Sequence, residues 1–164
     1  MEPKNAVRLD RSVGRFVYKL HLFLYRISFG LIGHRTPEGP VLLLSTVGRK
    51  SKVLRTTPLL YVPDNKKPAE IFYVVGSNGG RPQSPNWILN LQANSNAIVQ
   101  AGRRRYKVNA SILKGSEKDE IWETLVGFYK GWSYYETLTE RSIYPVRLRV
   151  EMPLSRSQVK KAFD

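Results

Sequence analysis

Two short segments of the chain concentrate groups that can bind an anion. In the first, "STVGRKSKVLRTTPL", a turn at Gly48 is followed by Arg49, Lys50 and Ser51, and then by Arg55. A glycine turn exposes backbone N–H groups, and cations with a hydroxyl beside them form a pocket for a phosphate or a carboxylate. The spacing does not match the G-x-x-x-x-G-K-[ST] pattern of a Walker loop. From this segment alone, a solvated basic turn remains the alternative.

The second segment, "GSNGGRPQSPNWILNLQANS" at residues 76–95, combines a glycine-rich turn with a short predicted helix. The glycines let the backbone approach a flat ligand closely. Ser84 as the cap and Pro85 in the first turn predict a helix start, whose free N–H groups favour an anion. Trp87 and Leu91 lie one turn apart and are expected to face the core, while the asparagines of this helix offer uncharged hydrogen-bonding groups. Together the two segments predict a site for a ligand with an anionic part and a flat part.

The charge distribution excludes several kinds of chemistry. The net charge of the chain is +14, yet the only acidic residues between positions 41 and 109 are Asp64 and Glu70. This segment therefore cannot supply a glycosidase-type carboxylate pair or an oxygen cage for calcium or magnesium. With no cysteine and two histidines, thiolate chemistry is excluded and no metal site is expected.

The elements that must position these segments follow from hydrophobic patterning and turn signals. Short β-rich runs at hairpin spacing, with helices at the ends and in one long connection, predict an α+β domain around a small antiparallel barrel. Ser116 with Asp119 is typical of a capping box at the start of a helix. The predicted strands are 40–46, 54–62, 70–76, 97–101, 105–113 and 144–151, and the predicted helices are 12–32, 85–93 and 116–129.

The predicted helix at residues 12–32 is amphipathic, with apolar positions at helical spacing and a basic stripe opposite them. Charged residues interrupt it too often for a membrane span, and it lacks the cleavage pattern of a signal peptide. Docking on its own domain is one interpretation. Lying in a membrane interface is the other.

The chain resembles the deazaflavin-dependent nitroreductase and quinone reductase family, which uses coenzyme F420. The resemblance rests on "GRKSKVLRTTPL", "GSNGGRPQSPNWILNLQAN" and "YETLTERSIYPV", which occur in the family's order over about two thirds of the chain. Three long ordered motifs are far more specific than a single glycine box. The resemblance implies a split β-barrel related to the flavin-reductase fold. It also implies an F420H2-dependent oxidoreductase that transfers a hydride to a small unsaturated, quinone or nitroaromatic substrate.

The resemblance implies site residues as well. The tail of the cofactor is acidic and would be bound by the first basic segment, and the deazaflavin with its ribityl chain by the second. Tyr135, Ser77 and Trp132 are the catalytic candidates, because a substrate over the reduced carbon needs an apolar wall and hydrogen-bond donors. The residues implied to bind the cofactor are Arg49, Lys50, Ser51, Arg55, Thr56, Pro58, Ser77, Asn78, Gly79, Gly80, Pro85, Asn86, Trp87, Asn90 and Leu91.

The sequence departs from the family pattern at five positions. Lys52 stands where a glycine is usual, Asn78 where a lysine or arginine is common, and Ser95 where a proline is common. Trp132 replaces a frequent tyrosine, and Tyr144 adds one residue before the last proline of the third motif. The last two departures touch the substrate side, so the cofactor site is the better-defined part of the prediction.

Two other functions remain open at this point: an FMN-dependent reductase on the same barrel, and a non-catalytic basic module that binds nucleic acid. We expect one domain over residues 1–164, with an N-terminal amphipathic helix region at 1–33 and a split-barrel cofactor-binding core at 40–151. The expected partner is a small hydrophobic electron acceptor rather than nucleic acid. Peripheral contact with an anionic membrane, from the cytoplasm at its inner face, and the choice between monomer and homodimer stay open.

Overall fold

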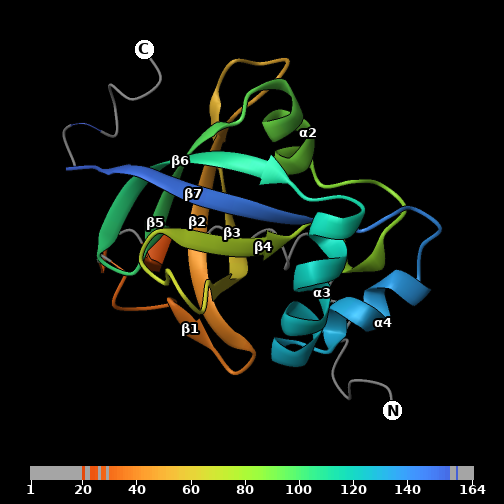
Figure 1. The fold of residues 1–164 in the computed structure, drawn as a ribbon. Coiled ribbons are helices and arrows are strands. Elements are labelled where there is room, and N and C mark those ends of the chain that lie inside the picture. The colour runs from red at the N-terminus through yellow and green to blue at the C-terminus, as the bar shows by residue number, and fades with distance from the viewer. Residues whose placement is uncertain (1–19, 21–22, 26, 29, 156–157, 159–164) are drawn as a thin grey trace.

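Antiparallel strands form a closed barrel in the computed structural model, which describes residues 20, 23–25, 27–28, 30–155 and 158. The strand order is β1-β2-β3-β4-β7-β6-β5, and β2 also pairs with β5, so six strands close on themselves (Figure 1). This architecture, with helices added around it, confirms the predicted α+β split barrel. The strands are β1 (Arg35–Thr36), β2 (Gly39–Val47), β3 (Leu54–Pro63), β4 (Ile71–Val75), β5 (Asn96–Ala101), β6 (Arg104–Ile112) and β7 (Pro145–Pro153).

The barrel is filled by inward-facing side chains of its strands. Leu42, Leu44, Val99, Val108 and Leu148 are all fully buried there. Burial of each such side chain stabilises the fold by about 1.5 to 3 kcal/mol relative to exposure. Truncating one of the leucines to alanine would cost about 2 to 5 kcal/mol, because a cavity adds to the lost transfer energy.

Helix α2 (Asn86–Ala93) closes the same core from outside the strands, through Trp87, Ile88 and Leu91. A β-carbon on Gly76 would lie 2.8 Å from the Ile88 side chain, so the glycine allows the loop after β4 to pass close to the helix. The residue before the helix is Pro85, and no side chain caps its first turn. The prediction that Ser84 caps this helix was therefore wrong, although the helix itself is where the sequence placed it.

Helices α3 (Ser116–Phe128) and α4 (Gly131–Thr137) contact each other at one side of the barrel, apart from α2 (Figure 1). They cover a second apolar cluster that includes Leu125, Trp132 and Ile143. Helix α3 begins at Ser116 as predicted, but its N-cap is Gly115 with φ 52°, and no side chain caps it. The helix start was therefore predicted correctly, but the predicted capping box is not formed.

The wall of the barrel opens between β3 and β4. Strand β3 pairs with β2 along Leu54–Leu60, whereas its pairing with β4 covers Tyr61–Pro63. Within the described residues, the first part of β3 therefore has a strand on one edge and a gap on the other. Val75, at the end of β4, and the short 3-10 turn η1 (Asn78–Gly80) that follows it lie at this opening.

Tyr25 is the buried residue by which the segment before β1 contacts the barrel most extensively. Tyr25 is fully buried; its hydroxyl donates to the carbonyls of Val41 and Gln100 and accepts from the N–H of Gly102. Most of the predicted 12–32 helix lies outside the described residues, while positions 20, 23–25 and 27 are helical. None of the described helices is long and apolar enough to cross a membrane.

Candidate active site

Two neighbouring cavities lie along β3 and are together called the groove. The first, here called the basic cavity, has a volume of about 710 Å³ and is lined by Gly48, Arg49, Lys50, Ser51, Arg55, Thr56, Thr57, Asn86 and Asn90. The second, here called the aromatic cavity, has a volume of about 280 Å³ and is lined by Thr36, Glu38, Val41, Pro58, Leu59, Leu60, Val75, Ser77, Gly79, Tyr129, Trp132 and Tyr135. Thr57 lines the first cavity and Pro58, the next residue, lines the second, so the two cavities follow each other along the strand. From Arg55 to Leu60 an extended strand covers about 17 Å, which suits a long ligand.

The turn that forms the floor of the basic cavity is tightly closed. The N–H of Gly48 donates to the carbonyl of Val53 at 2.9 Å, and the N–H of Lys52 donates to the carbonyl of Gly48 at 2.8 Å. Lys52 has φ 56°, a left-handed conformation in which glycine is favoured. The left-handed backbone explains why a glycine suits this position, and in this chain a lysine adopts that conformation.

Helix α2 holds this turn through asparagine side chains. Asn90 is buried; its Oδ1 accepts from the N–H of Arg49 at 3.1 Å, and its Nδ2 donates to Oγ1 of Thr46 at 3.0 Å. Asn86 Oδ1 accepts from the Arg49 guanidinium at 3.2 Å. Both ends of the Asn90 amide are thus occupied within the protein, so Asn90 fixes the turn on the helix.

The charge of the basic cavity is positive and uncompensated. Its lining residues include three cations and no acid. None of the four ion pairs among the described residues involves Arg49, Lys50 or Arg55. Cations without carboxylate partners, beside hydroxyls and a turn, are the donor set that binds phosphate and carboxylate groups.

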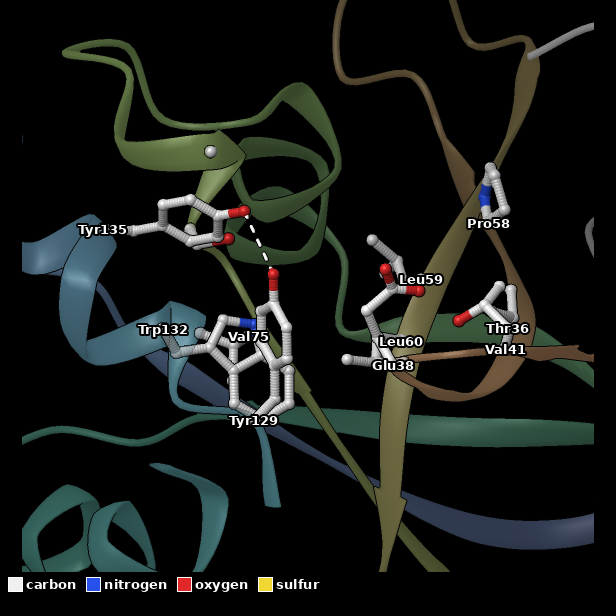
Figure 2. A pocket seen from close by; sticks show the side chains of 12 residues that line it. Thr36, Glu38, Val41, Pro58, Leu59, Leu60, Val75, Tyr129, Trp132 and Tyr135 are labelled. Carbon is white, nitrogen blue, oxygen red and sulfur yellow. Dashed lines mark hydrogen bonds between the residues drawn. The ribbon is translucent and has the colours of Figure 1, made fainter. Parts of the chain in front are cut away.

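Three aromatic side chains form one side of the aromatic cavity, opposite residues of β2, β3 and the turn before β2 (Figure 2). The rings of Tyr129 and Trp132 meet edge to face, with centroids 5.4 Å apart. The hydroxyls of Tyr129 and Tyr135 are 3.3 Å apart and share a hydrogen bond (Figure 2). Trp132 has no hydroxyl, unlike the tyrosine frequent in the family at this position. In this chain Tyr129, three residues earlier, brings a tyrosine hydroxyl to the same cavity.

The Tyr129 hydroxyl is held in its protonated form. Burial raises the pKa of Tyr129 above its ordinary value, and the hydrogen bond with Tyr135 and the negative charge of Glu38 raise it further. A hydroxyl that stays protonated at neutral and moderately alkaline pH can donate a hydrogen bond to a ligand in the cavity.

The glycine-rich loop at the opening is held by Arg141, which the sequence prediction did not include. Its Nη2 donates to the carbonyl of Ser77 at 2.6 Å, its Nη1 to that of Gly76 at 3.1 Å and its Nε to that of Arg81 at 2.9 Å. Burial lowers the pKa of Arg141, yet a guanidinium keeps its charge at neutral pH. The carbonyls of this loop therefore point toward Arg141 while Ser77 lines the aromatic cavity.

Gly80 fits helix α4 rather than a ligand. Its φ is 73°, and a β-carbon there would lie 2.8 Å from Leu138 and 3.1 Å from the carbonyl of Tyr135. Gly79, at φ 62°, lines the aromatic cavity, and a β-carbon there would meet nothing within 4 Å. The paired glycines therefore have different roles.

Most of the predicted site residues come together along the groove. Tyr135, Ser77 and Trp132, the predicted catalytic residues, all line the aromatic cavity. Trp87 and Leu91 are buried in the barrel core, where they position α2. The predicted cofactor residues that line one of the two cavities are Arg49, Lys50, Ser51, Arg55, Thr56, Pro58, Ser77, Gly79, Asn86 and Asn90, whereas Asn78, Gly80 and Pro85 line neither.

The residues at the site that the sequence prediction missed include Arg141, Tyr129 and Glu38. Arg141 lies inside the third motif, where its position in the family pattern was the available signal. Tyr129 and Glu38 lie outside all three motifs, and only the folded chain brings them to the aromatic cavity.

In this split barrel, a cavity lined by cations adjoins a cavity lined by aromatic rings, and the pair suits an elongated ligand with an acidic part and a flat ring. Comparison with known proteins gives the family. The sequence model of the F420H(2)-dependent quinone reductase family matches residues 17–151, and the chain belongs to that family. Its members are F420-dependent oxidoreductases, which confirms the predicted enzyme class and cofactor; the FMN and nucleic-acid alternatives are not favoured.

Individual relatives agree with this assignment. The chain is 35% identical over 139 residues to the F420H(2)-dependent quinone reductase Rv1261c of Mycobacterium tuberculosis, covering 82% of this chain and 91% of that protein. Among solved structures it is similar to an F420-H2 dependent reductase (FDR-A), with a TM-score of 0.59, 32% identity and coverage of 67% of this chain and 94% of that one. A second structure, described as a domain-swapped dimer, has a TM-score of 0.63, 27% identity and coverage of 84% of this chain and 99% of that one.

Proposed function

We propose that this enzyme reduces a quinone, or a similar small unsaturated or nitroaromatic acceptor, in the aromatic cavity. The basic cavity holds the acidic tail of coenzyme F420. The observation that supports this most directly is that the two cavities are lined by consecutive stretches of β3, with three cations in one and three aromatic rings in the other. When bound, the reduced cofactor supplies the hydride, and the chain supplies binding, orientation and a proton.

In the basic cavity, Arg49, Lys50 and Arg55 neutralise carboxylates and phosphates of the tail, with the hydroxyl of Ser51 as a further donor. The fit rests on the donor set itself, since these cations have no acidic partner among the described residues. Asn90 and Asn86 hold the turn in place, so the cations are presented with little ordering cost when the ligand arrives.

In the aromatic cavity, the chain orients the acceptor and delivers a proton. Trp132 and Leu60 are apolar walls that position a flat acceptor and exclude water. The hydroxyl of Tyr135, hydrogen-bonded to Tyr129, donates to a carbonyl or nitro oxygen that gains negative charge during reduction. The Ser77 hydroxyl is a second donor at the loop.

The test of the cofactor site is a fluorescence titration with coenzyme F420 and with FMN. We expect micromolar or tighter binding of F420 and much weaker binding of FMN, because three cations match a long polyanionic tail. Lys50→Ala and Arg55→Ala should each weaken F420 binding by about 1 to 3 kcal/mol, the scale of a lost charge-assisted hydrogen bond, with turnover at saturating cofactor near that of the wild type. Lys66→Ala, an exposed lysine in the β3–β4 turn, is the matched control for net charge. Equal affinity for the two cofactors, or none for either, contradicts the proposal.

We also propose that the enzyme works from the cytoplasm in peripheral contact with the inner face of an anionic membrane. The support is a set of large apolar side chains exposed beside the barrel in a protein of net charge +14. These are Leu20, Phe23, Ile27, Leu31 and Ile32, with exposed fractions between 43% and 61%. Apolar insertion together with attraction to acidic headgroups is how interfacial segments bind, and it would bring the enzyme to lipid-soluble quinones.

A further inference from the structure

The groove carries charge of opposite sign at its two ends. Glu38 lines the aromatic cavity and is the sole acidic side chain among the described residues that line either cavity. The chain as a whole carries +14, and the basic cavity contributes three cations to that charge. The acceptor end of the groove therefore carries one negative charge in a molecule whose net charge is strongly positive.

The backbone around Glu38 is fixed by contacts on both sides. The turn between β1 and β2 is closed by a hydrogen bond from Thr36 Oγ1 to the carbonyl of Gly39 at 3.1 Å. Gly39 has φ 142°, and a β-carbon there would lie 2.7 Å from the ring of Phe128 on α3 and 3.3 Å from Leu60 on β3. The turn is thus packed between α3 and β3, and this packing keeps the backbone of Glu38 beside the aromatic cavity.

Glu38 is exposed to solvent, lines the aromatic cavity and has no ion-pair partner among the described residues. None of the ion pairs among the described residues involves Glu38. Its field acts instead on the hydroxyl of Tyr129, across the aromatic cavity (Figure 2). A ligand that reaches the Tyr129–Tyr135 pair therefore experiences the same negative field.

We propose that Glu38 is a specificity-determining residue that selects neutral acceptors over anionic ones. This inference rests on the proposed function, since it concerns the acceptor of the same reaction. Like charges at close range disfavour binding by an amount that depends on exposure and salt. Without Glu38, the strongly positive surface would draw anionic acceptors into the cavity. The same carboxylate also disfavours the reversed placement of the ligand, with its acidic tail at the acceptor end.

The test compares two quinones: menadione, which is neutral, and a naphthoquinone sulfonate, which is anionic. At saturating reduced F420, Glu38→Gln should raise kcat/KM for the sulfonate relative to that for menadione by about 3- to 10-fold, mainly through a lower KM for the sulfonate. The gain should shrink in about 0.5 M salt, where screening is strong. Glu123→Gln, the same change on the exposed surface of α3, is the control for net charge.

A second readout does not depend on turnover. Quenching of tryptophan fluorescence by each quinone, without cofactor, gives Kd values for a cavity that contains Trp132. The Kd ratio of sulfonate to menadione should fall by the same 3- to 10-fold factor in Glu38→Gln. An unchanged ratio in both assays, or an equal change in Glu123→Gln, overturns the role of Glu38. A wild-type enzyme that reduces neither quinone, yet shows the Glu38-dependent Kd ratio, contradicts the proposed function and leaves the charge selection standing.

Discussion

The hydroxyl pair of Tyr129 and Tyr135 is the group best placed to act on an acceptor. We expect Tyr135→Phe and Tyr129→Phe each to lower kcat by about 10-fold or more, because general acids contribute factors of about 100 or more. Cofactor affinity, measured by fluorescence, should stay near that of the wild type. Tyr134→Phe, which removes an exposed neighbouring hydroxyl, is the control. An unchanged rate in both variants would assign the proton to water or to Ser77.

Arg141 contributes indirectly, because its guanidinium contacts loop carbonyls rather than the ligand. Arg141→Ala removes donors to three carbonyls and should weaken F420 binding about 10-fold or more, since each hydrogen bond from a charged group contributes about 1.5 to 3 kcal/mol. Arg141→Lys should rescue only part of this loss, because an ammonium cannot match the planar fork.

Guanidinium ion added at millimolar concentration should restore the F420 affinity of Arg141→Ala. It should not change the F420 affinity of the control Arg103→Ala, in which an exposed arginine is replaced. A loss of thermal stability without a change in F420 affinity would limit Arg141 to folding.

The sequence predicted elements better than the contacts between them. Periodicity and glycine signals located α2, α3 and the β5–β6 hairpin, because these depend on neighbours along the chain. They failed at both helix caps, because Pro85 and Gly115 precede these helices and no side chain bonds to the first turn. They also failed at Tyr129, because its place in the aromatic cavity depends on how the helices pack on the barrel. Lys52 illustrates the limit: its left-handed backbone is imposed by the closed turn, and its side chain gives no signal for that conformation.

Tyr25 is expected to contribute to the attachment of the segment before β1 through its buried hydroxyl. Burial raises the pKa of Tyr25 to about 12, whereas an unfolded tyrosine ionises near pH 10. The folded state therefore binds this proton more tightly, and its stabilising effect is complete below pH 10 and is lost as the pH rises to about 12.

Urea unfolding at pH 9 and at pH 11.5 measures the dependence on Tyr25. The wild type should lose more stability between these values than Tyr25→Phe, which has no hydroxyl to ionise at that position. Other tyrosines and the lysines titrate alike in both proteins, so the difference belongs to Tyr25. Parallel losses would mean that this hydroxyl does not hold the segment.

For the molecule as a whole, the exposed apolar segment and the net charge predict binding to acidic lipid. In cosedimentation, the wild type should bind vesicles with phosphatidylglycerol more strongly than phosphatidylcholine vesicles, and less so at high salt. Replacing Phe23, Ile27 and Leu31 by serine should weaken this binding several-fold while leaving F420 affinity unchanged. Deleting residues 1–32 is a poorer test, because it also removes the buried Tyr25. Equal binding to both vesicle types would exclude an electrostatic contribution.

The gap between β3 and β4 should affect how fast the backbone amides of β3 exchange with solvent. Along Leu54–Leu60 one edge of β3 has no neighbouring strand within the described chain, and an unpaired edge invites pairing with other chains. Pro58 lies within this stretch and has no N–H to donate to another strand. A ligand in the groove occupies the space of the absent strand, so cofactor binding should slow amide hydrogen exchange along this stretch of β3 far more than in β5, which is paired on both sides. Without cofactor, the same stretch would exchange first and be the place where self-association begins.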